Sequence, residues 1–448
     1  MVCSQKTIKG IPLSIYAAIL CNLVVSSIAQ TFVKPFLPRF VKYMGVSEVD
    51  AGYWVGIISS AITAGKFVTC LMWGLLADRL GRKDTLLIAG SGLLLTCIES
   101  GFCRAIWTVA GVRFLQGMSL GHRIMAKSIM SDHCDQNNLS FGMSFLKASS
   151  TLGTIIGPLV GALLVFPAQK YPSVFGEFFD KYVLLLPSVV LAALSLITLV
   201  TTLLCLPKDK PTNSNSNVKP FDMEKTFMKR FRIFEPMESN TFIVTCLLHM
   251  GLGIIGVGIK FTFPLFAATS RKYNGLALTE TKIAMLTLFP QILTIFYQLT
   301  FLPVIINSVG TKKSFIGSVL VFGASQTLLP FTALIKNNQV LLDGAVILVY
   351  SLVRSAIVGA SVTVDMFVNN SVDNRIVGSA HGVATMVSML GKYYFLFTFF
   401  CLSSSSFLIF VFERIILNFS FHFVYLAHFW NMHFLCFGSI KKSFSDPF

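Results

Sequence analysis

The sequence is poor in charged residues. Asp, Glu, Lys and Arg make up 12% of it, about half of the roughly 25% that is usual in soluble globular proteins. Apolar runs of roughly 20 residues recur along the chain, and each is long enough to cross a bilayer as a helix. This pattern excludes a soluble multi-domain protein and predicts an all-α integral membrane protein, because a backbone in lipid must satisfy its own hydrogen bonds.

The sequence also lacks the patterns of a catalytic or metal site. Its 10 cysteines are dispersed without zinc-ligand spacing, so we expect free thiols and no metal. No nucleophile–base pairing and no phosphate-binding loop is present, so we predict no catalytic residues, no cofactor and no enzyme. The formal net charge is +16, but the basic residues are scattered through short loops, which argues against a nucleic-acid partner. Such an excess is typical of cytoplasmic loops beside anionic lipid.

The stretch from Trp73 to Lys83 joins two long apolar runs and is highly charged. A turn with this much charge cannot lie in hydrocarbon, so we expect a short cytoplasmic loop between two helices. Gly74 would let two helices approach closely, and Gly81 would adopt a positive φ in the turn. Asp78 stands where a carboxylate can meet a guanidinium or a helix N-terminus. The residues that carry the pattern are Gly74, Leu76, Ala77, Asp78, Arg79, Gly81, Arg82 and Lys83.

This pattern resembles the G-x-L-A-D-R-x-G-R-K loop between the second and third helices of the major facilitator superfamily. The resemblance implies two pseudo-symmetric six-helix bundles, about 12 transmembrane helices in all, that reorient by alternating access around a central site. The motif would then act as a conformational hinge, with Asp78 paired to groups at a neighbouring helix end. The loop 307–314, which contains Gly310, resembles a degraded second copy of the motif, as an internal repeat predicts.

A second motif lies in the predicted span 107–130. Arg113, Gly117 and Gly121 recur every four residues, so on a continuous helix they form one stripe. The pattern is similar to the R-x-x-x-G motif of the superfamily's fourth helix, whose arginine is implicated in proton transfer in proton-coupled members. Because arginine stays protonated in proteins, its role would be electrostatic. The alternative is an arginine that pairs with a charge and fixes two helices.

The predicted span 141–166 contains the run Gly153-x-x-x-Gly157-Pro158-x-x-Gly161-Ala162. Small residues every four positions let helices touch, and Pro158 removes a backbone donor and bends the helix. The run is similar to the antiporter motif G-x-x-x-G-P-x-x-G-G, with Ala162 in place of the last glycine. The match favours export in exchange for protons, and the alternative is a general packing face.

Polar and ionisable residues inside spans face protein or water rather than lipid. Lys66 lies near the middle of the span 52–76, and Arg354 in the span 341–364 lies deep enough to need a partner. One stripe of the span 341–364 carries Tyr350, Arg354, Ser361 and Asp365. For Lys66 the alternative is a snorkelling or structurally paired lysine, and for the polar face of the first span, which carries Asn22 and Gln30, it is hydrogen bonding between helices. We select as candidates for the substrate cavity Asn22, Gln30, Gln116, His249, Gln291, Tyr350 and Arg354.

Composition divides the chain into four parts. Residues 1–206 would form the first six-helix half, and the polar stretch 207–240 a cytoplasmic linker. Residues 241–391 would hold helix seven to the early part of helix eleven. After Gly391 the sequence becomes rich in phenylalanine and poor in the small residues that let helices pack. We hypothesise that the tail 392–448 comes from a misjoined or unspliced coding end that impairs this isoform, which sequencing of the transcript across codon 391 would test.

These features predict a secondary active transporter that moves a small solute by proton-coupled export. The alternatives are a proton-coupled nutrient symporter of the same superfamily and a non-transporting membrane receptor or inactive isoform. Within the superfamily the motifs look most like the drug:proton antiporters of about 12 spans, which implies multidrug efflux. Trp73 and the run Asp50-Ala51-Gly52-Tyr53 resemble the zinc-induced-facilitator-like branch, although the Cys-Pro-Gly-Cys of that branch is absent.

The expected partners are a small solute, protons and membrane lipid. We expect a monomer in the plasma membrane or in a vacuolar or other internal membrane.

Overall fold

The structure is a computed structural model, and it describes residues 7–8, 11–167, 179, 181–207, 240–269, 271, 275–335, 338–372 and 376–403. Nearly all of the predicted linker, residues 208–239, lies outside the described residues, as does the tail from residue 404. The division of the sequence at residues 206, 240 and 391 therefore stays a prediction.

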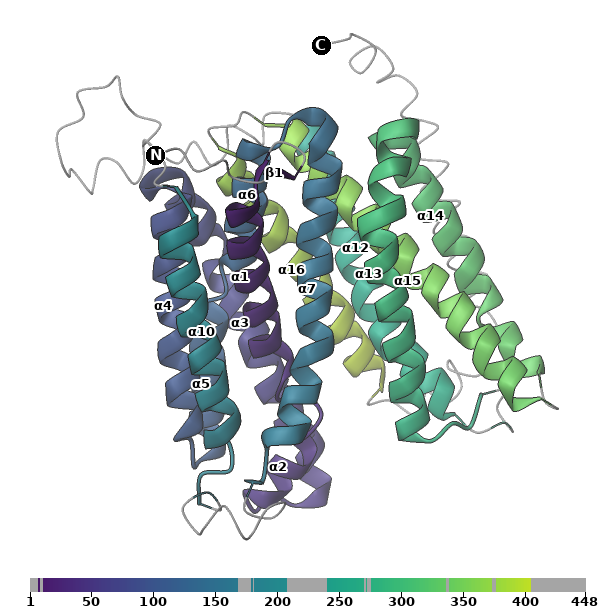
Figure 1. Ribbon diagram of the computed structural model, residues 1–448. Coiled ribbons are helices and arrows are strands. Elements are labelled where there is room, and N and C mark those ends of the chain that lie inside the picture. The colour runs from purple at the N-terminus through teal and green to yellow at the C-terminus, as the bar shows by residue number, and fades with distance from the viewer. Residues whose placement is uncertain are drawn as a thin grey trace. The chain divides into compact units, whose positions relative to one another are not determined.

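The described residues fall into two compact units. The larger lies within Met1–Gly253, Ile295–Thr311 and Ser361–Gly391, and the smaller within Ile254–Thr294, Lys312–Ala360 and Lys392–Phe448. In the larger unit, α1 packs against α7 and α10, α3 against α5, and α4 against α10 (Figure 1). Its helices from the first part of the chain are α1 (Leu13–Thr31), α2 (Leu37–Tyr43), α3 (Glu48–Leu80), α4 (Arg82–Gly101), α5 (Ile106–Met118), α6 (His122–His133), α7 (Gln136–Leu164) and α10 (Leu185–Cys205).

The second part of the chain is also helical. Its elements are α12 (Asn240–Ala268), α13 (Glu280–Val309), α14 (Thr311–Leu328), the 3-10 helix η4 (Pro330–Leu334), α15 (Gln339–Asn370) and α16 (Val377–Ser403). Because α12, α13, α15 and α16 cross the boundaries of the units, each contributes residues to both. The strands in the described residues are β1 (Thr7–Ile8) and β2 (Ile11–Pro12), a two-residue antiparallel pair, so the all-α class holds.

Each unit has its own apolar core. In the larger unit Phe32, Phe40 and Leu191 are almost fully buried within one cluster. In the smaller unit Phe263 stacks on Tyr350 with ring centroids 4.0 Å apart. Large apolar side chains also cover the exposed faces of many helices, as a lipid-facing surface requires.

Eight helices in the described residues are long and apolar enough to cross a membrane: residues 13–31, 53–80, 138–164, 185–205, 240–268, 282–309, 311–334 and 339–370. They establish a multi-pass integral membrane protein. Among the remaining helical segments, α4 and the expected span 107–130 depart from this pattern for visible reasons. The first turn of α4 carries Arg82, Lys83 and Asp84, and the expected span 107–130 is interrupted.

The hinge is shorter than the loop expected between Trp73 and Lys83. α3 continues to Leu80 and α4 begins at Arg82, so Asp78 and Arg79 are helical and Gly81 alone makes the turn. The φ of Gly81 is 92°, which confirms the expected positive value and is a conformation that other residues resist. Gly310 makes the same one-residue turn between α13 and α14, with a φ of 89°, as the resemblance between the two loops predicts.

The expected span 107–130 is two helices rather than one. α5 ends at Met118 and α6 begins at His122, so the prediction of one continuous stripe through Arg113, Gly117 and Gly121 is wrong. The Met118 carbonyl accepts hydrogen bonds from Trp73 Nε1 at 2.6 Å and from Thr69 Oγ1 at 3.0 Å. These α3 side chains replace the amide partner that a continuous helix would supply, which is a recognised cause of a helix break.

Residues 34–49 follow the first span, and their prolines Pro35 and Pro38 favour a loop, but the segment contains a short helix. α2 covers Leu37–Tyr43, with Pro38 in its first turn. Proline ends the helix before it but is well tolerated in the first turn of the next one, where its missing N–H has no helical partner in any case.

Candidate functional site

Asp78 connects the end of α3 to the start of α16. Its Oδ1 accepts a hydrogen bond from the backbone N–H of Gly378 at 3.1 Å, and its Oδ2 accepts one from the N–H of Ser379 at 2.7 Å. The Ser379 hydroxyl also donates to Oδ2. A carboxylate at a helix N-terminus interacts favourably with the unpaired amides and the helix dipole. The expected pairing of Asp78 with a neighbouring helix end is therefore present in the structure.

Close packing accompanies this contact. A Cβ added to Gly74 would collide with the carbonyl oxygen of Gly378 and lie only 2.9 Å from its carbon. The two backbones can therefore touch only because Gly74 has no side chain. Gly378 is under the same steric constraint, since a Cβ added to it would lie 3.0 Å from the Gly74 carbonyl oxygen.

The other charges of the hinge motif bind neighbouring helices. Arg82 pairs with Asp132 at 2.7 Å, and its Nε donates to Ser128 Oγ at 2.9 Å, which joins α4 to α6. Lys83 Nζ donates to the carbonyls of Leu203 and Leu206 at the end of α10, where a positive charge complements the helix dipole. Arg79 lies in the last turn of α3.

The buried Arg113 of α5 has no acidic partner in the described part of the chain. Its exposed fraction is 5%. Nη1 donates to the Ala29 carbonyl at 2.9 Å and to Gln116 Oε1 at 2.5 Å, and the guanidinium lies 4.9 Å from the Phe32 ring centroid. Neutral carbonyl, amide and ring groups thus surround a full positive charge.

The polar face of α1 makes two kinds of contact. Asn22 is 2% exposed and its Nδ2 donates to Thr202 Oγ1 of α10 at 2.8 Å, which is a hydrogen bond between helices. Gln30 accepts a hydrogen bond from Lys66 of α3. The structure therefore brings Gln30, Arg113 and Gln116 to one region and places Asn22 in the packing between α1 and α10.

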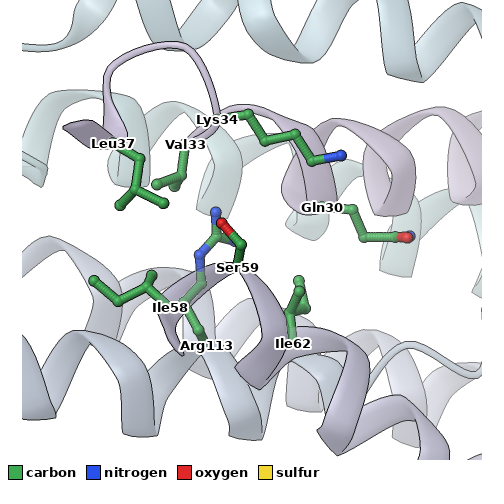
Figure 2. A pocket seen from close by; sticks show the side chains of 8 residues that line it. All are labelled: Gln30, Val33, Lys34, Leu37, Ile58, Ser59, Ile62 and Arg113. Carbon is green, nitrogen blue, oxygen red and sulfur yellow. The ribbon is translucent and has the colours of Figure 1, made fainter. Parts of the chain in front are cut away.

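A pocket of about 260 Å³, including space open to solvent, lies beside Arg113. Figure 2 shows Arg113 among side chains from α1, α2, α3 and the turn after α1. The lining residues are Gln30, Val33, Lys34, Leu37, Ile58, Ser59, Ile62 and Arg113.

The glycine motif of α7 packs against α1. A Cβ on Gly153 would lie 2.6 Å from Ser27 Cβ, one on Gly157 would collide with Thr31, and one on Gly161 with the carbonyl of Phe32. The three glycines thus follow α1 turn by turn, which is the close helix contact that their spacing predicts. Pro158 lies within α7 between the second and third glycines.

A buried ionic cluster joins α6, α12, α15 and α16. Asp365 is 8% exposed. Its Oδ1 lies 2.6 Å from Lys127 Nζ and 3.2 Å from His249 Nε2. His381 is fully buried, and its Nε2 lies 2.6 Å from the Oδ1 of Asn369, one turn after Asp365.

Sequence reasoning selected His249 and saw Asp365 only as part of a stripe. Lys127 was missed, because nothing in its local sequence points to a partner 238 positions away. The available signal was the position of Lys127 within the predicted span 107–130, where an ionisable residue is expected to be functional or paired.

The remaining cavity candidates lie in the smaller unit. Tyr350 packs in its core against Phe263, and Gln291 Nε2 donates to the Thr287 carbonyl of its own helix at 3.1 Å. Arg354 follows Tyr350 by one turn of α15, and its buried Nε has no hydrogen-bond partner in the described residues.

Burial lowers the reactivity of two thiols outside the membrane-spanning segments. Burial and the neighbouring charge of Asp135 raise the pKa of Cys134 to about 12. Burial also raises the pKa of Cys103. Both thiols stay protonated at neutral pH and are poor nucleophiles or metal ligands. Within the described residues no group of His, Cys, Asp and Glu could hold a metal ion.

Comparison with known proteins gives a consistent result. The family model described as Major Facilitator Superfamily matches residues 19–392. Zinc induced facilitator 1 of Arabidopsis thaliana is 25% identical over 397 residues, which are 80% of this chain and 77% of that protein. Multidrug resistance protein MdtG of Yersinia enterocolitica is 31% identical over 137 residues, 30% of this chain and 33% of that protein. The solved structure of the proton:xylose symporter XylE is similar with a TM-score of 0.67 at 14% identity, over 89% of this chain and 90% of that one.

Proposed function

The chain belongs to the major facilitator superfamily of membrane transporters, and from this premise we propose that it exports a small solute in exchange for protons. The observation that carries the proposal is Asp365, a buried carboxylate within 3.2 Å of two cationic or titratable groups. An intramembrane ionisable residue is costly to bury and usually marks an ion or proton pathway.

Protonation of Asp365 would change the stability of the state in which α6 contacts α15. Lys127, His249 and His381 face Asp365 from α6, α12 and α16, and Arg123 of α6 is close enough to interact with it electrostatically. A proton on Asp365 would remove the negative charge that balances these groups. Removing one partner of a buried ion pair costs about 3–5 kcal/mol, which changes the ratio of two states by roughly two to three and a half orders of magnitude. Proton binding can therefore drive alternating access.

Asp78 would stabilise the same state. Its contact with Gly378 and Ser379 joins α3 to α16, just as the pair of Asp365 with Lys127 joins α15 to α6. Both contacts must break when α3 and α6 separate from α15 and α16. In this mechanism Asp78 acts as the hinge residue and Arg113 as a fixed positive charge near the solute path.

Two observations support export rather than uptake. The glycines of α7 pack along α1 in the spacing of the antiporter motif. One relative is named a multidrug resistance protein, which makes multidrug efflux the form of export that we propose. We further propose that the transporter acts as a monomer.

Proteoliposomes that contain the pH dye pyranine would test the exchange. The lumen is made acidic, and compounds from a toxicity screen of the expressing strain are added outside. For an antiporter, entry of the substrate drives protons out, so the lumenal pH rises. A fall in lumenal pH on addition of substrate without a gradient would instead establish symport.

Asp365→Asn is the decisive variant, because it keeps the shape of the side chain and removes its titration. We expect it to abolish proton movement that depends on substrate. Asp343→Asn is the matched control: Asp343 also lies on α15 and pairs with a lysine, Lys282 at 2.9 Å, but its side chain is 27% exposed. Normal exchange by Asp365→Asn, or equal loss in both variants, would remove Asp365 from the proton pathway.

A further inference from the structure

We infer that Lys34 and Arg113 form a head-group subsite for an organic anion, a carboxylate attached to a short aliphatic chain. This inference names a substrate class for the transporter and so rests on the proposed function. The subsite is the pocket of Figure 2, formed by α1, α2, α3 and α5.

The first argument is uncompensated charge. Arg113 and Lys34 both line the pocket, and in the described residues no carboxylate pairs with either. Both hydrogen bonds of Arg113 come from Nη1 and end on neutral oxygens. A buried cation such as Arg113 is normally paired with an anion. Lys34 is exposed and adds a second positive charge to the same pocket, so the pocket is matched to an anion that comes from outside the chain.

The second argument is the geometry of the donors. Because the hydrogen bonds of Arg113 use Nη1 alone, the rest of its planar fork can bind a carboxylate. The hydroxyl of the exposed Ser59 also lines the pocket. Gln30 is already engaged, since it accepts from Lys66 and donates to the Ser26 carbonyl at 2.9 Å. The donors that are available to a ligand are thus predominantly cationic.

The third argument is the rest of the wall. Four aliphatic side chains complete the pocket: Val33, Leu37, Ile58 and Ile62. An aliphatic wall beside two cations suits an amphiphilic anion better than a small, strongly hydrated one. The pocket is partly open to solvent, so a bound head group can leave the rest of a larger solute outside it.

Equilibrium dialysis of purified full-length protein in detergent, at low ionic strength, would test the subsite. The probes are hexanoate, its neutral amide hexanamide and the cation hexylamine. We expect hexanoate to bind at least tenfold more tightly than either of the others. Equal binding of hexanoate and hexanamide would overturn the inference. Complete displacement of hexanoate by an equal concentration of chloride would also overturn it, because the site would then accept any small anion.

Substitutions connect this binding to the two cations. We expect Lys34→Gln and Arg113→Gln each to weaken hexanoate binding at least tenfold, and Lys34→Arg to keep it within about threefold. Lys42→Gln is the matched control, because it removes one positive charge from the exposed face of α2 and does not line the pocket. Lys34 lies outside the helices, so its variant remains informative even if Arg113→Gln fails to fold. Equal effects of Lys34→Gln and Lys42→Gln would refute the subsite.

The binding assay is independent of proton coupling. Hexanoate binding that depends on Lys34, together with flux that ignores a pH gradient, would retain the anion subsite and reject proton exchange. Proton-coupled flux of neutral or cationic compounds alone, without hexanoate binding, would give the opposite result.

Discussion

Asp78→Asn is expected to loosen the contact between α3 and α16 without preventing membrane insertion. Asp78 accepts two backbone hydrogen bonds and one hydroxyl hydrogen bond from the first turn of α16. Asparagine keeps one acceptor oxygen but turns an amide donor toward groups that are themselves donors. It also removes the negative charge from the N-terminus of the helix.

The size of the effect follows from these losses. A hydrogen bond to a charged group contributes about 1.5–3 kcal/mol, and a charge at a helix N-terminus about 0.3–1 kcal/mol. Losing one such bond and the charge gives about 2–4 kcal/mol. Because 1.4 kcal/mol is a factor of ten, the state held by this contact should become roughly 30- to 700-fold less favoured. Transport should therefore slow, since the cycle needs both states.

Hydrogen–deuterium exchange read by mass spectrometry measures this directly. The amides of Gly378 and Ser379 are the donors to Asp78, so peptides that cover the start of α16 should exchange at least tenfold faster in the variant. Asp84→Asn is the matched control, because it makes the same change of charge in the first turn of α4. Unchanged exchange at the start of α16 in Asp78→Asn, or unchanged flux, would refute the role of Asp78 as a hinge.

Three substitutions test the packing. Gly161→Ala should lower the stability of the purified protein by about 1–3 kcal/mol, because its Cβ would collide with the Phe32 carbonyl. In the control Gly111→Ala the added Cβ meets no atom within 4 Å, so this variant should be neutral or stabilising. Equal midpoints of thermal unfolding for the two variants would contradict the helix contact. Gly81→Ala should cost about 1–3 kcal/mol, since its φ is 92°; an unchanged midpoint would argue against that turn. Trp73→Phe removes one of the two donors to the Met118 carbonyl and should cost about 0.5–1.5 kcal/mol, whereas an unchanged midpoint would mean that Thr69 alone satisfies this carbonyl.

The features that could be predicted from the sequence are those that depend only on residues close together in the chain. Gly81 was expected at a turn with positive φ, and Gly310 at a second copy of that turn, because glycine and its neighbours define such turns locally. The glycines of α7 were likewise expected to face a close helix. The break after Met118 could not be predicted in this way, since it depends on Trp73 and Thr69 of another helix.

The same reasoning explains the partial success at the candidate site. His249 was selected and Asp365 was noted, but their meeting with Lys127 depends on tertiary structure. Polar residues inside a span show that a partner exists without showing which one it is. Asn22 shows the alternative role of a polar residue inside a span, because it donates a hydrogen bond to Thr202 in the packing between α1 and α10.

The two contacts proposed to control the transport cycle are linked through one short region. Asp365 binds Lys127 near the end of α15, and Asp78 binds Ser379 at the start of α16. Between them, the contact of Asn369 with His381 ties the last turn of α15 directly to the first turns of α16. If α15 shifts when Asp365 takes up a proton, this contact moves the start of α16 with it, and the bond to Asp78 must follow. The hinge motif and the buried carboxylate would therefore respond as one element, although they are distant in the sequence. Packed side chains and hydrogen bonds can carry coupling between two sites, and the Asn369–His381 contact is the physical reason to expect that proton binding and hinge opening occur together.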